Sequence, residues 1–188
     1  LKKIYRDLGA DGLSFEPLFA FGSNAASGHH WPDDTRLKPG DCILVDIGCT
    51  WEGYCSDMTR TFFYKNVTQH QQEVYHTVLK ANEEAEKAVT PGIPLSSLDQ
   101  IARGIITDKG YGSAFTHRLG HFIGLEDHEF GDVSSASADR AVPGNIFSIE
   151  PGIYLENDMG VRVEDLVLVT DHGHEILNHF SKELTVID

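Results

Sequence analysis

Residues 42–64, CILVDIGCTWEGYCSDMTRTFFY, decide the fold, because apolar segments flank a group of turn residues. They predict two antiparallel strands, Asp41–Thr50 and Cys55–Tyr64, joined by a turn at Trp51–Tyr54. Both strands contain an acidic side chain, although aspartate is rare in strands and an ionised carboxylate is costly to bury. The hairpin is therefore expected to carry a function as well as a fold.

Asp46 and Asp57 are the two acids in question. If they oppose each other, the pairing is centred between Trp51 and Glu52, which lies inside the expected turn. Both carboxylates then share one face of the sheet, with their β-carbons about 5 Å apart. Directly opposed like charges destabilise a sheet, so this arrangement calls for a cation.

A second hairpin near the C-terminus repeats this arrangement. Its expected strands are Asn145–Glu156 and Val161–Thr170, and the pairing of Glu150 with Glu164 is centred on Asn157 in the turn. The alternation of side chains along a strand lets both glutamates share one face. A second opposed pair of acids strengthens the case for a compensating cation.

The segment HRLGHFIGLEDHE, residues 117–129, places three histidines within twelve positions and follows no helical pattern. Gly120 and Gly124 in this segment allow close approach of the backbone. Four carboxylates and one imidazole suit a pair of Mn²⁺, Co²⁺ or Zn²⁺ ions, which together can acidify a shared water. The alternative that stays open is a solvent-exposed strand face on which Arg60 and Arg162 pair with the acids.

Two amphipathic helices are expected between the hairpins. The first spans Gln69–Val89 after a capping box formed by Thr68 and Gln71, and the second spans Ser97–Lys109. Helices that alternate with antiparallel hairpins predict an α+β fold, with helices covering one face of a curved sheet. The order of elements also hints at two related halves. The other expected elements are a helix at Leu1–Leu8, strands at Leu13–Phe21 and Glu175–Val186, and a loop at Ser23–Gly40.

The 188 residues suit one domain and carry 15 Lys plus Arg against 29 Asp plus Glu, a formal net charge of −14. This charge argues against a nucleic acid or an anionic membrane as partner, since both require a basic face. Apolar runs are too short to span a bilayer. The three cysteines form no CxxC pair, which favours free thiols in the reducing cytoplasm. Cys49 and Cys55 lie nearly opposite each other across the first turn, and a reduced pair is expected.

Five short motifs carry a resemblance that covers the chain from Ser14 onward. They are VDIG at 45–48, SDMTRT at 56–61, HRLGH at 117–121, SIEPGIY at 148–154 and RVEDLV at 162–167. In this order and spacing they resemble the pita-bread metallopeptidases of the creatinase/aminopeptidase type, most closely the prolidase and aminopeptidase P branch. The resemblance implies a curved antiparallel sheet covered by helices in two pseudo-related halves, with one catalytic domain over residues 1–188. It also implies a further N-terminal helix, an upstream domain and a homodimer in the intact protein.

The resemblance implies hydrolysis of peptide bonds that precede proline, by a hydroxide that bridges two divalent ions. Mn²⁺ is the expected ion, with Co²⁺ and Zn²⁺ as the other candidates. Asp46 resembles a ligand of the first ion, and His121 a ligand of the second. Asp57 and Glu164 resemble carboxylates that bridge both ions. Glu150 resembles a further ligand of the second ion that also acts as general base, and the implied substrates are small peptides with proline after the scissile bond.

Three histidines and one arginine resemble groups that contact the substrate. His29, in SGHH, resembles the substrate-binding histidine, and the adjacent His30 is the alternative. His128 resembles the histidine that contacts the scissile bond and supports the tetrahedral intermediate, as a donor to the developing oxyanion would. His117 resembles a further active-site histidine. Arg162 resembles an arginine that binds a carboxylate or anchors a loop.

Departures from the family pattern concern substrate binding more than metal binding. Arg118 stands where glycine is usual, Asp127 where an apolar residue is usual, and Ser27-Gly28 where Leu-Pro is usual. Other interpretations stay open: a methionine aminopeptidase or a creatinase-like hydrolase on the same fold, or a non-catalytic binding module. RVED at Arg162–Asp165 is atypical of methionine aminopeptidases, and a binding module is expected to lose metal ligands. These residues do not separate dipeptidase from aminopeptidase activity.

Overall fold

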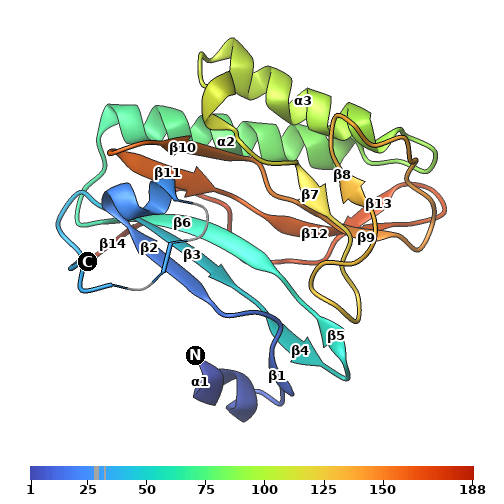
Figure 1. Cartoon of the computed structure of the whole chain (residues 1–188), viewed down its shortest axis with the longest axis horizontal. Helices are drawn as coiled ribbons and strands as arrows, with labels where there is room; N and C mark the ends of the chain where they lie inside the picture. The colour runs from blue at the N-terminus through green and yellow to red at the C-terminus, as the bar shows by residue number, and fades with distance from the viewer. Residues whose placement is uncertain (28–29, 32) are drawn as a thin grey trace.

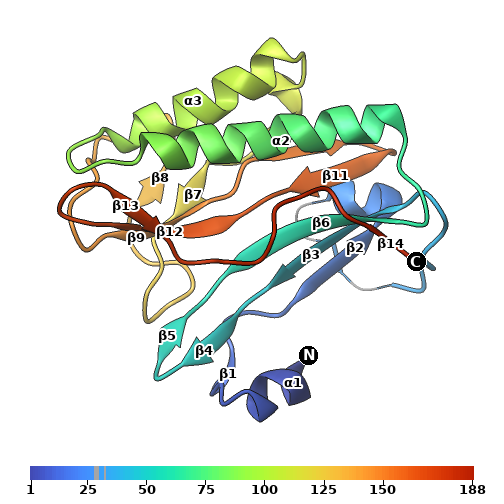
Figure 2. The same ribbon diagram turned by 180° about the vertical axis from the view of Figure 1, so that it is seen from behind.

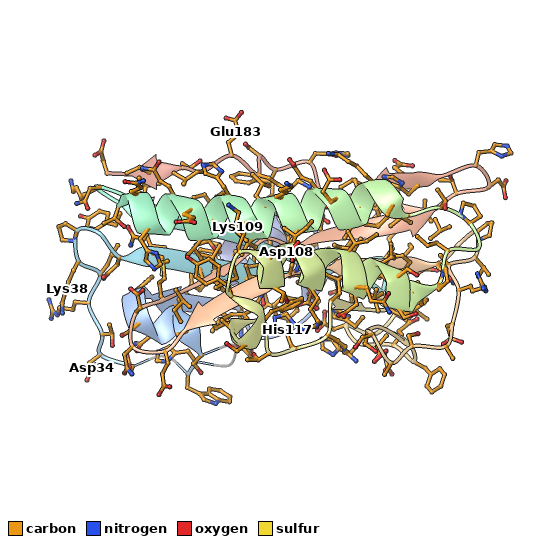
Figure 3. The ribbon with its side chains drawn as sticks, turned by 90° about the horizontal axis from the view of Figure 1, so that it is seen from above. Asp34, Lys38, Asp108, Lys109, His117 and Glu183 are labelled. Carbon is orange, nitrogen blue, oxygen red and sulfur yellow. The ribbon has the colours of Figure 1, made fainter. Side chains whose placement is uncertain are left out.

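The computed structural model describes residues 1–27, 30–31 and 33–188. Its two long helices, α2 (Gln69–Ala88) and α3 (Leu95–Asp108), form a layer over the strands (Figure 1). Seen from the helix side, α2 and α3 run next to each other across the sheet (Figure 3). Helices over antiparallel hairpins confirm the expected α+β class. The other helical elements are α1 (Lys2–Asp7) and the 3-10 turns Gly22–Ala26 and Gly112–Ala114.

The first hairpin lies at the centre of a sheet with strand order β14-β6-β3-β2. β3 (Cys42–Ile47) and β6 (Met58–Tyr64) pair so that Asp46 faces Thr59, and the expected pairing of Asp46 with Asp57 is wrong. Asp57 instead lies just before β6, outside the paired strand. The neighbouring strands are β1 (Gly12–Leu13), β2 (Leu18–Phe21), β4 (Cys49–Trp51), β5 (Tyr54–Cys55) and β14 (Val186–Ile187).

The turn of this hairpin explains the different register. Glu52 and Gly53 have positive φ angles of 49° and 82°, the conformation that a tight two-residue turn between antiparallel strands requires. The turn centres the pairing one residue later than expected and places Cys55 opposite Thr50. Cys49, the neighbour of Thr50, therefore points to the other face of the ribbon. Both cysteines are free thiols, as expected.

The second hairpin keeps the expected register in both of its halves. Neither Glu150 nor Glu164 lies within a strand, because both occupy a break between the halves, where Pro151 has no N–H for the ladder. The break releases both carboxylates from the pleat while the register keeps them opposite each other. The strands of this region are β7 (Gly120–His121), β8 (Asp132–Val133), β9 (Ile146–Ile149), β10 (Gly152–Leu155), β11 (Met159–Arg162), β12 (Asp165–Val169) and β13 (His174–Ile176).

Helix α2 begins where the sequence predicts. The Thr68 hydroxyl accepts a hydrogen bond from the Gln71 N–H, and the Gln71 side chain accepts one from the Thr68 N–H, which completes the capping box. Val74 and Val78 on its apolar face are fully buried in the core. Helix α3 begins at Leu95, two residues earlier than expected. No helix within the described ranges combines the length and apolarity needed to cross a bilayer.

The strands expected near the two ends of the chain are shorter than predicted. The first is divided into β1 and β2, and Pro17 immediately precedes β2. The last is divided into β13 and β14, with an irregular segment, 177–185, between them (Figure 2). Side chains donate hydrogen bonds to carbonyl groups of this segment. Arg60 donates to the carbonyls of residues 180 and 181, and Tyr75 donates to that of Lys182. A segment whose carbonyl groups bond to side chains does not continue as a strand.

Candidate metal centre

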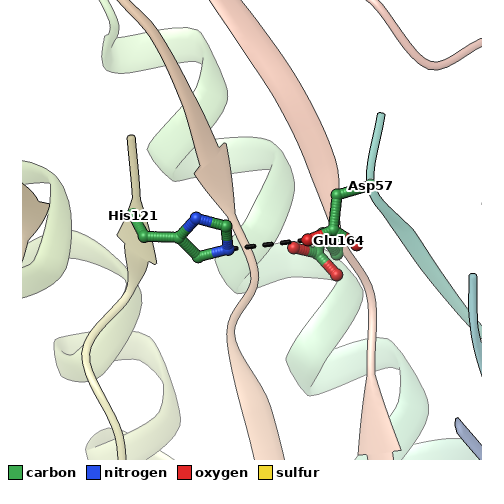
Figure 4. Close-up of side chains that lie close together, drawn as sticks. All are labelled: Asp57, His121 and Glu164. Carbon is green, nitrogen blue, oxygen red and sulfur yellow. Dashed lines mark ion pairs between the residues drawn. The ribbon is translucent and has the colours of Figure 1, made fainter. Parts of the chain in front are cut away.

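The five predicted metal ligands line one cleft with a volume of about 720 Å³. His121 Nε2 lies 3.5 Å from Asp57 Oδ2 and 3.5 Å from Glu150 Oε1. One ligand atom each from Asp57, His121 and Glu164 lie within 4.8 Å of one another (Figure 4). Asp46 completes the set from β3. The sheet break and the two hairpins thus bring together side chains that are far apart in the sequence.

His121 reaches the acids because its neighbour has no side chain. A β-carbon on Gly120 would lie 1.8 Å from the carbonyl oxygen of Ser148, so β7 and β9 can approach only with glycine at this position. The His121 N–H then donates to Ser148 Oγ over 3.0 Å. Nδ1 lies 3.1 Å from the carbonyl oxygen of Phe122, which makes it the protonated nitrogen. Nε2 keeps its lone pair and faces the carboxylates.

Gly120→Ala is expected to displace His121 and to destabilise the protein. The new methyl group meets backbone atoms, which cannot rotate away, so the free energy of unfolding should fall by about 3 kcal/mol, the upper end for overpacking. Thermal melting and metal affinity would measure the two effects. Gly104→Ala is the matched control, because a β-carbon there meets nothing within 4 Å. Equal melting temperatures for the two variants would contradict the prediction.

Burial shifts the acid–base equilibria of the cluster. Burial, reinforced by neighbouring carboxylates, raises the pKa of Asp57 and of Glu164 far above the ordinary range. Burial also raises the pKa of Glu150 to about 7, although Arg162 lowers it. The pKa of His121 falls to about 4 because burial disfavours the imidazolium, so the ring is neutral at pH 7. The carboxylates resist joint ionisation unless a cation accompanies them.

The hydrogen-bonding of the buried oxygens agrees with a cation. Asp46 Oδ1, Asp57 Oδ1 and Glu164 Oε1 are buried and have no hydrogen-bond partner within the described part of the chain. An unpartnered buried oxygen is costly, and few occur in folded proteins. Carboxylate and imidazole donors together suit divalent ions such as Mn²⁺, Co²⁺ and Zn²⁺. The residues present therefore fit a divalent metal.

Arg162 connects Asp46 to a buried hydrogen-bonded chain. Its Nη2 lies 2.5 Å from Asp46 Oδ2, its Nε donates to Thr59 Oγ1 over 2.9 Å, and its Nη1 donates to the Tyr154 hydroxyl over 3.0 Å. The hydroxyl of Tyr154 in turn lies 2.9 Å from His117 Nε2, to which it donates. His117 is not among the described residues that line the cleft, and this chain of hydrogen bonds connects it to Asp46. Burial lowers its pKa to about 4.

Tyr154 is a residue of the site that sequence reasoning missed. Its hydroxyl reaches Arg162 across Gly152, the residue that pairs with Arg162. A β-carbon on Gly152 would lie 2.6 Å from the Tyr154 hydroxyl, so the glycine leaves the space that the tyrosine fills. The available signal was a glycine expected to pair with an arginine, Gly152 with Arg162, followed two positions later by a tyrosine.

Two of the other candidate histidines, His128 and His30, line the cleft. His128 lines the cleft, and its ring stacks on that of His121 with centroids 3.8 Å apart. Arg118 Nη2 lies 3.2 Å from His128 Nδ1. His30 also lines the cleft, whereas His29 lies outside the described residues.

Asp127 is a second residue of the site whose role the sequence did not predict. In the sequence it stands out only as a departure from the family pattern. Its side chain lines the cleft, and its Oδ1 is buried without a hydrogen-bond partner within the described ranges. Burial and the nearby Asp46 raise its pKa to about 6. A fifth carboxylate thus lines the cleft of the candidate metal centre.

Comparison with known proteins identifies the family. The sequence matches the model of metallopeptidase family M24 over residues 1–171. The chain belongs to metallopeptidase family M24. It is 46% identical over 182 residues to an uncharacterized peptidase of Staphylococcus aureus (strain MRSA252), a match that covers 97% of this chain and 52% of that relative.

Solved structures of named peptidases superpose closely on the M24 chain. A prolidase from Thermococcus sibiricus gives a TM-score of 0.96 at 40% identity and covers 98% of the M24 chain and 50% of the prolidase. An X-Pro aminopeptidase from Thermotoga maritima gives a TM-score of 0.95 at 37% identity, and the match covers 99% of the M24 chain and 53% of the aminopeptidase. The M24 chain therefore spans about half the length of the relatives it matches. These likenesses confirm the resemblance and the pita-bread fold that the motifs implied.

In the M24 chain, Arg60 and Lys182 bind the backbone of Glu164 and the side chain of the next residue, Asp165. Arg60 Nη1 donates to the Glu164 carbonyl over 2.6 Å, and Arg60 Nη2 pairs with Asp165 Oδ1 at 2.6 Å. Lys182 Nζ contacts Asp165 Oδ2 at 2.9 Å and Glu86 Oε2 at 2.7 Å. A buried ionic network thus ties α2, β6 and the C-terminal segment to the strand break that carries Glu164.

Glu86→Gln is expected to gain stability relative to the wild type as the pH rises. Burial raises the pKa of Glu86 to about 7, against the lowering effect of Lys182. Because this folded-state pKa lies above the unfolded value of 4.5, the stabilisation from the protonated carboxyl is complete below pH 4.5 and is lost as the pH rises towards 7. Glutamine does not titrate and has no such loss. The free energy of unfolding of Glu86→Gln relative to that of the wild type should therefore rise by at most about 3 kcal/mol between about pH 5 and about pH 8. Thermal melting at both pH values measures it.

The control for this prediction is Glu84→Gln, because Glu84 is half-exposed on the same helix. A stability difference between Glu86→Gln and the wild type that stays constant with pH would contradict the prediction.

Proposed function

We propose that the M24 chain is the catalytic domain of a metal-dependent exopeptidase that cleaves the peptide bond before proline. The observation that carries the proposal is the convergence of four carboxylates and one neutral imidazole in a single cleft, with buried oxygens left unpartnered within the described residues. The names of two structural neighbours, a prolidase and an X-Pro aminopeptidase, support the choice of substrate.

The positions of the five residues support a centre with two ions. Asp57 and Glu164 would serve as ligands shared by the two ions, Asp46 as a ligand of the first, and His121 and Glu150 as ligands of the second. We propose Mn²⁺, because most of the donors are carboxylate oxygens. Bound divalent ions would acidify a water molecule and polarise the carbonyl oxygen of the scissile bond.

Glu150 is the proposed proton carrier. Its Oε1 accepts a hydrogen bond from Ser148 Oγ over 3.2 Å, which orients the carboxylate where it lines the cleft. A carboxylate in this position can accept a proton from the attacking water and deliver it to the nitrogen of the leaving proline. His128, on the loop that borders the cleft, would donate to the carbonyl oxygen as negative charge develops there.

Two further features of the cleft support a small peptide as substrate. Asp127 Oδ1, which has no hydrogen-bond partner among the described residues, can accept a hydrogen bond from a free α-ammonium group, which an exopeptidase must recognise. Phe15, Leu18 and Trp31 add an apolar surface that a side chain or a proline ring can cover. We propose His29 as a further substrate contact.

Hydrolysis assays on the intact, Mn²⁺-loaded protein test the proposal. An Xaa-Pro dipeptide and an Xaa-Pro-Yaa tripeptide should be cleaved before proline, and the preferred length separates dipeptidase from aminopeptidase. The matched Xaa-Ala peptides and the N-acetylated Xaa-Pro peptides should react much more slowly. Equal rates on Xaa-Ala peptides, or cleavage of N-acetylated peptides at full rate, would reject the proposed specificity.

A further inference from the structure

One buried amide on α2 contacts both halves of the break in the second hairpin. Asn82 is fully buried, and its Nδ2 donates to the carbonyl of Ile149 over 2.9 Å. The same Nδ2 lies 3.5 Å from the carbonyl oxygen of Val163. These two residues immediately precede Glu150 and Glu164. A single side chain thus reaches the backbone beside two proposed ligands that come from opposite sides of the hairpin.

The orientation of this amide is unambiguous. Lys182 Nζ can only donate, and it lies 2.9 Å from Asn82 Oδ1, so this atom is the oxygen. The nitrogen therefore faces the two carbonyl groups, which can only accept. Lys182 is itself held by Glu86 Oε2 at 2.7 Å, so the amide is anchored from behind by an ion pair. An anchored donor between two backbone carbonyls limits their relative movement.

We infer that Asn82 is a positioning residue of the metal centre, which keeps the backbones of Glu150 and Glu164 at the separation that binding requires. This inference rests on the proposed metal centre. The two glutamates lie outside the strands, so ladder hydrogen bonds of their own do not set their spacing. At the break, the Val163 N–H donates to the Pro151 carbonyl over a long 3.5 Å, and Asn82 supplies a side-chain link between the same two backbone segments. Outer contacts of this kind orient ligands and tune metal affinity.

The inference is tested with two variants of the intact protein and one matched control. Asn82→Leu removes every polar atom at similar volume, and Asn82→Asp keeps the acceptor for Lys182 but loses the donor. Thr77→Val is the control, because Thr77 is also buried on α2 and its hydroxyl donates only within the helix, to the Glu73 carbonyl over 2.7 Å. Calorimetric titration with Mn²⁺ and the visible absorption spectrum of the Co²⁺-loaded protein are measured, together with melting in EDTA.

Both Asn82 variants should bind Mn²⁺ about 10- to 100-fold more weakly and show an altered Co²⁺ spectrum. Thr77→Val should melt at a lower temperature than the wild type but keep the wild-type Mn²⁺ affinity and Co²⁺ spectrum. Wild-type affinity and spectrum in the Asn82 variants, or equal weakening in Thr77→Val, would overturn the inference. If Asn82→Leu does not fold, Asn82→Asp decides alone, because it is isosteric with the wild-type residue.

These measurements separate the two proposals. Failure of the wild type to cleave Xaa-Pro peptides rejects the proposed substrate, but the comparison of metal affinities still decides the role of Asn82. Failure of the wild type to bind divalent metal rejects both.

Discussion

Asp57→Asn is expected to abolish both metal retention and peptide hydrolysis. Asp57 is 5% exposed, contacts His121 at 3.5 Å and is grouped with Glu164 around a common point. Loss of a proposed bridging ligand should lower the metal affinity by more than the roughly 10- to 100-fold that is typical when a residue that only supports a ligand is replaced. Metal content and the hydrolysis of an Xaa-Pro dipeptide would be measured on the intact protein. The control is Asp139→Asn, a substitution of an exposed aspartate.

In the metal-free protein, by contrast, Asp57→Asn should increase the thermal stability. Burial, with Glu164 as the next cause, raises the pKa of Asp57 above its unfolded value of 3.8. The stabilisation from the protonated carboxyl is therefore complete below about pH 4 and decreases as the pH rises towards the folded-state pKa. In EDTA at about pH 8, Asp57→Asn should melt at a higher temperature than the wild type. Retention of metal with full activity, or a lower melting temperature in EDTA, would contradict this account.

Glu150→Gln is the second substitution with a large expected effect. Glutamine keeps the size of the side chain and one oxygen, but it cannot accept a proton at neutral pH. The loss of a general base lowers kcat by about 10²- to 10⁴-fold, and kcat for Xaa-Pro hydrolysis should fall within this range. Metal content must be measured in parallel, because Glu150 is also a proposed ligand.

The matched control for this substitution is Glu156→Gln, an exposed glutamate in the turn of the same hairpin. It should keep the wild-type kcat. A Glu150→Gln protein that retains wild-type kcat at wild-type metal content would exclude Glu150 as the proton carrier.

The two hairpins differ in how far the sequence predicts their register. In the second hairpin, apolar alternation and a turn around Asn157 lead to the observed pairing of Gly152 with Arg162 and of Ile149 with Asp165. In the first, the assumption that Asp46 faces Asp57 is wrong, because register follows the turn. Glu52 adopts a positive φ, which is uncommon for residues other than glycine, asparagine and aspartate, so the position of the turn is hard to predict from its residues.

The chemistry of the site was predictable to different degrees. Acidic side chains inside apolar segments are locally anomalous, and for this reason Asp46, Asp57, Glu150 and Glu164 stand out without a structure. Tyr154 and Asn82 are ordinary where they occur, since a tyrosine in a strand and an asparagine in a helix violate no local pattern. Their importance comes from contacts with Arg162 and with backbone carbonyls 67 or more positions away.

The sequence by itself determined the α+β class, the capped helix α2, the family and the set of acids and histidine that face one another. These features are local, because hydrophobic period, capping residues and short motifs depend on neighbours in the chain. Tertiary structure alone decided the break that frees Glu150 and Glu164, the separation of His117 from the cleft, and the support of the acids by Asn82 and Arg60. Packing brings remote segments together, and the cost of burying charge then selects the partners that each carboxylate receives.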